Sequence, residues 1–388
     1  MATPTILPPS KLPNVGTTIF TTMSALANEY SAVNLSQGFP DFMCSEKLIN
    51  LVSKAMHDGK NQYAPMAGDP LLRQRIAHKV ESLYRQSIDP DTELTITAGG
   101  TQAIFTAIGA FVHPGDEVII IEPAYDCYKP AIELFGGHTV PYALHAPDYT
   151  IDWAVLESLI TPATRMLITN NPHNPTGRVF SRHDLTRLRD IVIRHNLLLI
   201  SDEVYEHLTY DGLTHESVLR YPELYARTLV IFSFGKTYHN TGWKTGYCIA
   251  PPGLTTEFRK VHQFNVFSAN TPIQAAYSAF MADPNEYLGL PAFFQAKRDL
   301  LLHSMQGSAF SPLICQGSYF QLFDYSSLSD LPDTEFCQWL VQHHQVAAIP
   351  LSPFYTVPPD DKIIRLCFAK KDETITNAAK RLRDILIM

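Results

Sequence analysis

Two lysines in one short segment could carry covalent chemistry. Lys236 follows the apolar run 228–232, and Lys244 lies eight residues further on. An aldehyde cofactor needs one amine for a Schiff base and a separate cationic or hydroxyl-bearing group for its phosphate. A cationic ring and a second lysine nearby would lower the pKa of Lys236 and favour its free amine. Ser233 and Lys244 remain for the phosphate, so the segment predicts a site for pyridoxal phosphate.

Asp202 could supply the negative charge that such a ring requires. It follows the apolar run 197–201 and precedes Tyr205 by three residues. A carboxylate at the end of a buried strand is poorly solvated and needs a cation or hydrogen-bond donors. A protonated pyridine nitrogen would be such a cation, and Tyr205 could donate to the ring hydroxylate. A structural aspartate that accepts from backbone amides fits the same pattern.

Three further turns follow apolar runs and could contact the same ligand. Gly99 and Gly100 precede a helical pattern, where small residues and helix N-terminal amides suit a phosphate. Tyr125 offers an aromatic face for stacking. Asn174 lies in a loop stiffened by two X-Pro steps, which suits the presentation of one side-chain amide. Each has a purely structural alternative: the two glycines could form a tight turn, Tyr125 could be a packed tyrosine, and Asn174 could be a turn-forming asparagine.

A parallel sheet would bring these turns together, because ligands bind beyond the carboxyl ends of strands in open α/β sheets. Continuous apolar runs separated by helical patterns predict such a sheet, covered on both faces. One of the helices is expected over 181–196, with Ser181 and Asp184 in the places of a capping box. The six predicted strands are 93–97, 117–121, 165–169, 197–201, 229–233 and 246–250.

The rest of the chain has a different pattern. The first 40 residues read as an arm with one short helix near 21–29, and a helical stretch is expected over 274–308. Shorter strands are expected at 317–323, 346–349 and 363–368. A helical stretch followed by short strands predicts a second, smaller α+β domain. A second domain is expected because the chain has 388 residues, whereas a single hydrophobic core stops growing at roughly 250 to 300 residues.

Composition narrows the function classes. A net charge of −8 without basic runs argues against a nucleic-acid partner. No apolar run approaches the ~20 residues of a membrane span, and the first ten residues lack a signal-peptide pattern, so a cytoplasmic location is expected. The six cysteines show no C-x-x-C spacing, which predicts reduced thiols and no metal site. Gly235-Lys236-Thr237 is not a P-loop, because Val230 stands where that motif needs glycine.

In this order, the motifs Gly-Gly-Thr, Asn-Pro-x-Asn-Pro-x-Gly, Ser-Asp-Glu-Val-Tyr, Ser-Phe-Gly-Lys and Gly-Trp-Lys-x-Gly resemble those of the class I/II aminotransferases of PLP fold type I. The resemblance spans nearly the whole chain. Segments 37–42, 61–65 and 233–251 are most similar to the branch that holds bacterial methionine aminotransferase and the kynurenine/glutamine aminotransferases.

The resemblance implies an α/β fold with a mostly parallel seven-stranded sheet between helices in a large domain, plus a smaller α+β domain. The expected limits are 1–45 for the arm and part of the small domain, 46–285 for the large PLP-binding domain and 286–388 for the small C-terminal domain.

The resemblance also assigns roles to single residues. Lys236 would form the imine with the cofactor, Asp202 would pair with the ring nitrogen, and Tyr125 would stack on the ring. Tyr63 would reach the phosphate of the neighbouring subunit, which implies a homodimer. Asn174 and Tyr205 would contact the ring hydroxyl. The phosphate would be held by Gly100, Thr101, Ser233 and Lys244. Arg365 would bind the substrate carboxylate, and Gly38 and Phe20 would line the same pocket.

The implied activity is transamination of a neutral amino acid with a 2-oxo acid. Methionine is favoured, with phenylalanine, histidine, glutamine and kynurenine as further candidates, since Phe20, Phe39 and Tyr63 suit a long neutral side chain. One alternative is a β-lyase acting on cysteine conjugates at the same cofactor site. A second is a PLP-sensing receptor domain, which needs a DNA-binding segment for which the short start is expected to leave no room.

Overall fold

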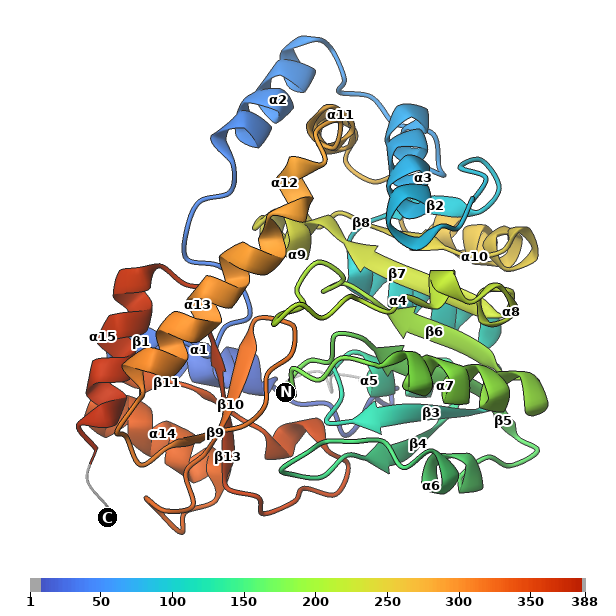
Figure 1. The fold of residues 1–388 in the computed structure, drawn as a ribbon. Coiled ribbons are helices and arrows are strands. Elements are labelled where there is room, and N and C mark those ends of the chain that lie inside the picture. The colour runs from blue at the N-terminus through green and yellow to red at the C-terminus, as the bar shows by residue number, and fades with distance from the viewer. Residues whose placement is uncertain (1–7, 386–388) are drawn as a thin grey trace, which may run out of the picture.

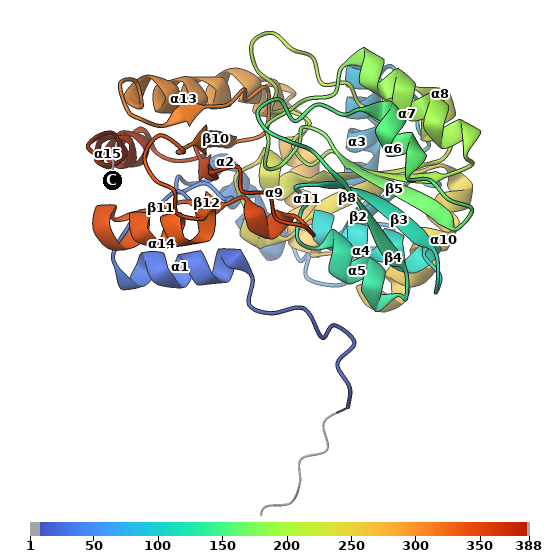
Figure 2. The same ribbon diagram turned by 90° about the horizontal axis from the view of Figure 1, so that it is seen from below.

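The computed structural model describes residues 8–385 and places a seven-stranded sheet between two layers of helices, with a smaller lobe at one side (Figures 1 and 2). The strand order is β2-β8-β7-β6-β5-β3-β4, and β8 runs in the direction opposite to the other six strands. The expected mostly parallel sheet is therefore confirmed. The strands are β2 (Leu94–Thr97), β3 (Glu117–Glu122), β4 (His138–Ala143), β5 (Thr164–Asn170), β6 (Leu198–Asp202), β7 (Thr228–Ser233) and β8 (Gly246–Ile249).

The six strands predicted from apolar runs all form, with bounds that shift by one residue at most. The seventh strand, β4, has no continuous apolar run and contains Pro141. It lies at the edge of the sheet, beside β3 alone. An edge strand tolerates a proline because it has one side without a ladder partner, so its sequence pattern is weak.

The apolar strands are buried on both faces because successive side chains point to opposite layers. Leu229 and Ile231 pack with α4 and α5, whereas Val230 and Phe232 belong to the larger core on the other face. Figure 2 shows α4, α5 and α10 on one side of the sheet and α3, α6, α7 and α8 on the other. These helices are α3 (Pro70–Tyr84), α4 (Gly100–Phe111), α5 (Tyr128–Leu134), α6 (Trp153–Ser158), α7 (Arg182–Arg194), α8 (Pro222–Tyr225) and α10 (Pro252–Asn265).

The predicted capping box is present at α7. The Ser181 hydroxyl accepts from the Asp184 amide at 3.2 Å, and the Asp184 carboxylate accepts from the Ser181 amide at 2.8 Å. Aspartate thus replaces the usual glutamate, and the helix begins where the sequence predicts.

The small lobe holds a four-stranded antiparallel sheet and helices from both ends of the chain (Figure 1). The arm joins it, because Val33 pairs with Val346 in a short parallel ladder. The predicted strand 317–323 begins later, at Phe320, since Ser318 has a left-handed φ of +63°. The elements are α1 (Ile19–Glu29), β1 (Val33–Asn34), α13 (Leu290–Ser304), β9 (Ser311–Pro312), β10 (Phe320–Asp324), α14 (Asp333–His344), β11 (Val346–Ala347), β12 (Ile349–Pro350), β13 (Ile363–Cys367) and α15 (Asp372–Arg383).

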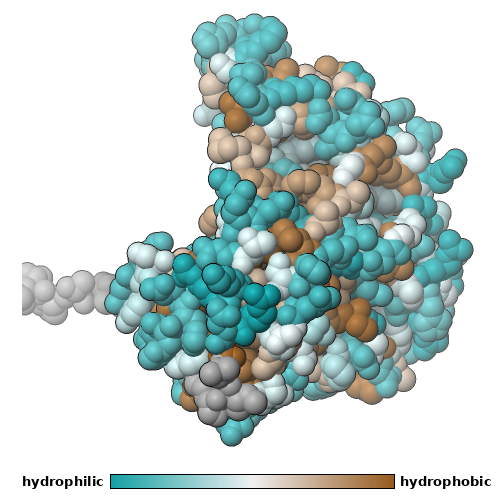
Figure 3. Space-filling view, turned by 60° about the vertical axis from the view of Figure 1, so that its left-hand side comes forward, coloured by the Kyte–Doolittle hydropathy of each residue, from teal (hydrophilic) through white to brown (hydrophobic). Residues whose placement is uncertain are grey.

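The remaining helices connect the two lobes. The helical stretch expected over 274–308 is divided into α11 (Thr271–Phe280), α12 (Asn285–Leu288) and α13, with Pro284 at the first break. The helix α2 (Glu46–His57) packs against α11 and projects at the top of the molecule, where apolar residues gather in the hollow below it (Figure 3). Within residues 8–385, no helix is both long and apolar enough to cross a membrane. The domain limits stay a prediction.

Candidate active site

A cavity of about 270 Å³ lies at the carboxyl ends of the central strands, where the two lobes meet. The strand register explains this position. Asn170 of β5 pairs with Asp202 of β6, so the polar residues that end neighbouring strands lie at one edge. Every predicted site residue except Tyr63 lines the cavity: Phe20, Gly38, Gly100, Thr101, Tyr125, Asn174, Asp202, Tyr205, Ser233, Lys236, Lys244 and Arg365.

Lys236 lies on α9 (Phe234–Thr237), the short helix that begins directly after β7. Its amine donates to the Tyr319 hydroxyl at 3.0 Å and to the Gly38 carbonyl at 3.3 Å. Burial lowers the pKa of Lys236 to about 8, because the charged ammonium is poorly solvated there. Roughly a tenth of this side chain is therefore a nucleophilic free amine at pH 7, a far larger fraction than for an ordinary lysine.

Asp202 is 3% exposed at the end of β6. Its carboxylate accepts from the Tyr128 hydroxyl at 2.6 Å and from the Val204 amide at 3.3 Å. Burial raises the pKa of Asp202 to about 6 against these two donors. Within residues 8–385, no lysine, arginine or histidine lies within ion-pair distance of it, so a ligand cation would stabilise its charged form.

The turn between β2 and α4 leaves groups free for an anion. Gly99 has a φ of +88°, and a Cβ added there would lie 3.6 Å from the Lys244 amine. The Ser233 hydroxyl makes no capping bond to α9. The Thr101 hydroxyl, in the first turn of α4, lies 3.1 Å from that of Tyr125. Two hydroxyls, an ammonium and the N-terminal amides of a twelve-residue helix can together hold a phosphate.

Arg365 of β13 reaches the cavity from the small lobe and is 1% exposed. Its guanidinium donates to the Asn174 side-chain oxygen and to the Ser36 carbonyl, each at 3.0 Å, and its central carbon lies 3.9 Å from the centre of the Phe320 ring. Its Nε has no hydrogen-bond partner, and among the described residues no carboxylate pairs with it. Burial lowers the pKa of Arg365 to about 10. Arg365 therefore forms no salt bridge within residues 8–385.

Aromatic and amide groups complete the walls. Tyr205 is 3% exposed and lies edge-on to Tyr319, with ring centres 5.2 Å apart. The backbone N–H of Asn174 donates to the Asn170 side-chain oxygen, and the Asn170 side-chain nitrogen donates to the Asp202 carbonyl. The loop that carries Asn174 is thereby fixed to the ends of β5 and β6.

Several contact residues were not predicted, among them Asn170, Tyr128 and Tyr319. Asn170 ends a strand, so the strand-end reasoning that singled out Asn174 could also have found it. Tyr128 contacts Asp202 across 74 residues of sequence, and Tyr319 contacts Lys236 across 83. No local pattern signals such contacts, because they depend on how elements meet.

Tyr63 lies outside the cavity of this subunit. It is 83% exposed, and its ring packs edge-on against Phe267 with centres 5.3 Å apart. Its predicted contact with a neighbouring subunit stays a prediction.

Comparisons with known proteins agree with this arrangement. The family model for aminotransferase class I and II matches residues 30–382. Methionine aminotransferase of Escherichia coli (strain K12) is 49% identical, over 98% of this chain and 99% of that protein. Kynurenine–oxoglutarate transaminase 1 of Mus musculus is 38% identical, over 92% of each protein.

Solved structures are similar along the whole chain. The crystal structure of YbdL from Escherichia coli, identified with a methionine aminotransferase function, has a TM-score of 0.96 at 49% identity and covers 98% of this chain and 100% of that chain. N-succinyldiaminopimelate aminotransferase from Mycobacterium tuberculosis has a TM-score of 0.94 at 36% identity, with 98% and 100% covered. The chain therefore belongs to the class I and II aminotransferases and has the fold type I architecture of that family.

Proposed function

We propose that this aminotransferase binds pyridoxal phosphate and moves an amino group between a neutral amino acid, methionine above all, and a 2-oxo acid. One observation carries the proposal. The cavity is lined by the buried side chains of Asp202 and Arg365 and the partly buried side chain of Lys236, and none of these three forms an ion pair with another residue of 8–385. Buried charges need partners, so a ligand with an aldehyde, a cationic ring nitrogen and a carboxylate-bearing substrate would satisfy all three.

The residues present fit this cofactor. Bound pyridoxal phosphate supplies an aldehyde that exchanges between amines and a ring that withdraws electrons. Asp202 would accept from the ring nitrogen, and the gained cation would return its raised pKa towards the ordinary range. Tyr125 would cover one ring face, while Asn174 and Tyr205 would contact the ring hydroxyl. Gly100, Thr101, Ser233 and Lys244 would hold the phosphate.

The chain's own groups then provide orientation and proton transfer. Arg365 would bind the substrate carboxylate with parallel N–H donors, which orients the Cα–H bond. The amine of Lys236, once free, would take the proton from the substrate Cα and deliver it to the aldehyde-derived carbon of the cofactor. A pKa of about 8 suits this role, because a general base works best near the operating pH.

The walls near Arg365 favour a neutral substrate side chain. The rings of Phe20, Phe320 and Phe354 surround its guanidinium, with centres 5.3, 3.9 and 5.9 Å away. Besides Arg365, the only basic residues that line the cavity in the described chain are Lys236 and Lys244. Each already has a role, so an acidic substrate side chain would lack a partner.

We also propose a homodimer in which Tyr63 contacts the phosphate in the neighbouring subunit. Its support is the exposure of large apolar side chains in the single chain: Met43 is 81%, Tyr63 83% and Phe264 86% exposed. The exposed ring of Tyr63 adjoins that of Phe267, which is 42% exposed, and adjoining exposed apolar side chains are typical of surfaces that a partner covers. A cytoplasmic location remains a prediction.

The test is a half-reaction assay with the reconstituted protein. Methionine, phenylalanine, histidine, glutamine and kynurenine are each added without an oxo acid, and the loss of visible absorbance and the 2-oxo acid product are measured. Aspartate is the acidic control. Methionine should react fastest. No absorbance change with any amino acid would contradict transamination, a preference for aspartate would contradict the neutral pocket, and release of pyruvate and ammonia from cysteine conjugates alone would favour the β-lyase.

A further inference from the structure

The Tyr319 hydroxyl joins the reactive amine to the opposite lobe. It lies 2.5 Å from the Gly38 carbonyl oxygen and 3.0 Å from the Lys236 amine. A carbonyl has no proton to give, so Tyr319 donates to Gly38. Its oxygen therefore accepts an N–H from Lys236. The same carbonyl lies 3.3 Å from the amine and can accept its second hydrogen.

These two contacts restrict the geometry of the amine. A neutral lysine amine has two hydrogens and one lone pair, and rotation about the Cε–Nζ bond normally leaves the lone pair free to point anywhere on a cone. With one hydrogen on Tyr319 and the other on Gly38, only one direction remains for the lone pair. The nucleophilic orbital of Lys236 is then held in one orientation before any reaction begins.

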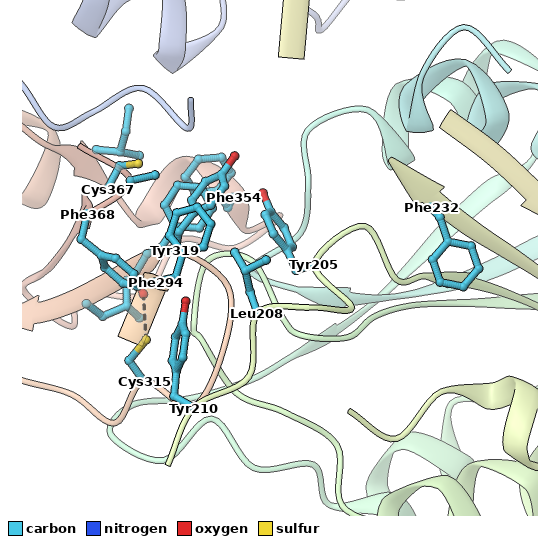
Figure 4. Packing of buried hydrophobic residues seen from close by; sticks show 14 of the residues in the cluster. Tyr205, Leu208, Tyr210, Phe232, Phe294, Cys315, Tyr319, Phe354, Cys367 and Phe368 are labelled. Carbon is cyan, nitrogen blue, oxygen red and sulfur yellow. Dashed lines mark hydrogen bonds between the residues drawn. The ribbon is translucent and has the colours of Figure 1, made fainter. Parts of the chain in front are cut away.

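Tyr319 is itself held by its surroundings. It is fully buried, and its ring contacts those of Tyr205, Phe294 and Phe320 with centres 5.2, 5.9 and 4.8 Å away. Figure 4 shows Tyr319 beside Phe294 and opposite Tyr205, with Tyr210 in the same cluster. Because the ring fills the space, removal of the hydroxyl alone would leave this packing in place.

We propose, on the basis of the function proposed above, that Tyr319 is a further catalytic residue. With the Gly38 carbonyl it orients the Lys236 amine for attack on the aldehyde carbon of pyridoxal phosphate, and it receives the amine again whenever a substrate amino group displaces it. In the attack a C–N bond forms, and both amine hydrogens leave with the aldehyde oxygen as one water. In the displacement the two hydrogens of the substrate amine end on Lys236 and restore both contacts.

The proposal has a consequence for the protonation of Lys236. Asp202 and Cys367 face this amine and raise its pKa, while burial, Arg365 and Lys244 lower it. Tyr205 is a further titratable neighbour, and a hydrogen bond with Tyr319 is among the influences on its pKa, so loss of the Tyr319 hydroxyl also affects Tyr205. The Tyr319 oxygen also accepts from the ammonium form and stabilises it. Removing that oxygen should therefore lower the pKa of Lys236 below about 8.

The experiment compares Tyr319→Phe with Tyr210→Phe in the cofactor-free protein. Tyr210 is buried in the same cluster and donates to the Ser318 carbonyl, so Tyr210→Phe removes a neighbouring hydroxyl without touching Lys236. The first readout is the rate at which an amine-reactive reagent labels Lys236 across pH, followed by mass spectrometry. The second is the rate at which added pyridoxal phosphate forms a borohydride-fixable adduct with Lys236.

In Tyr319→Phe, the midpoint of labelling should fall by about one pH unit, since a hydrogen bond to a charged group is lost. Adduct formation should slow about tenfold at a pH above both midpoints, because the lone pair is no longer oriented. Tyr210→Phe should match the wild type in both readouts.

Equal behaviour of the two variants in both readouts would overturn the inference and leave the proposed function intact. A Tyr319→Phe protein that unfolds under assay conditions in which Tyr210→Phe stays folded would give the hydroxyl a structural role and overturn it too. If the wild type forms no adduct with pyridoxal phosphate, the proposed function fails, and with it the catalytic role; the labelling profile then reports only whether Tyr319 contacts Lys236.

Discussion

Replacement of Arg365 by methionine should separate the stability of this protein from its activity. Methionine has a similar length but cannot donate hydrogen bonds or carry charge. In the wild type the buried guanidinium lacks a carboxylate partner within residues 8–385, and its pKa falls from 12.5 to about 10. That fall corresponds to about 3 kcal/mol of unfavourable burial. Since the folded pKa lies below the unfolded one, this cost is present in full at every pH below about 10.

Methionine would remove that cost but also leave two acceptors without their donor. The Ser36 carbonyl and the Asn174 side-chain oxygen each lose a hydrogen bond from Arg365. Each loss costs about 1–3 kcal/mol if the acceptor stays dry. The gains and losses therefore nearly cancel, and Tm should stay within about 3 °C of the wild type. Substrate binding has no such compensation. Loss of a buried partner for a carboxylate costs about 2–5 kcal/mol, or roughly 30- to 4,000-fold in kcat/KM.

Arg298 offers a matched control. It is 7% exposed, lies outside the cavity, and pairs with Asp211 through two bonds of 2.6 and 2.7 Å. Arg298→Met should therefore lower Tm by several degrees and leave kcat/KM unchanged. The assays are thermal unfolding, methionine turnover and titration with pyridoxal phosphate, whose affinity should change little in Arg365→Met. A kcat/KM for methionine within about threefold of wild type would refute the carboxylate clamp. A loss of stability equal to that of Arg298→Met would refute the account of Arg365 as an unpaired cation.

The remaining predictions concern the other unpaired groups and the dimer. Lys236→Ala should abolish the visible absorbance of the reconstituted protein and its turnover, and retention of both would remove the central role of this lysine. Asp202→Asn should fold but lose several orders of magnitude in kcat, about 10³-fold or more, so a near-normal kcat would count against the electron-withdrawing role of the ring. The pKa of Asp202 rises from 3.8 to about 6 in the cofactor-free protein, so the stability contributed by its protonated form is fully present below pH 3.8 and is lost as the pH rises through 6. Asparagine cannot ionise and does not lose stability in this way. The Tm of Asp202→Asn should therefore exceed that of the wild type above pH 6 but not below pH 3.8. Dimers reassembled from Lys236→Ala and Tyr63→Ala subunits should be more active than a dimer of either variant alone, because one of their two sites combines an intact Lys236 with the partner's Tyr63. Activity that is not restored would place Tyr63 in its own subunit's site or outside any site.

Much of the large lobe could be predicted from the sequence, because strands buried on both faces require continuous apolar runs. The same runs end at one edge of a parallel sheet, so Asn174, Asp202 and Lys236 could be singled out as residues that follow strands. Two strands differ from the prediction for local reasons. Pro141 obscures the edge strand β4, and the left-handed backbone at Ser318 shortens β10.

The site as a working unit depends on contacts between distant segments. Arg365 meets Asn174 across 191 residues and Ser36 across 329, while Tyr319 meets Gly38 across 281. A residue pattern states which face of an element is apolar, but it does not state which other element covers that face. By itself, therefore, the sequence determined the elements and the kinds of chemical group at their ends. Only the tertiary structure decided that Asp202 and Arg365 are buried, that Lys236 is partly buried beside them, and that none of the three has an ion-pair partner within residues 8–385, because burial and pairing depend on the lobes coming together around one cavity.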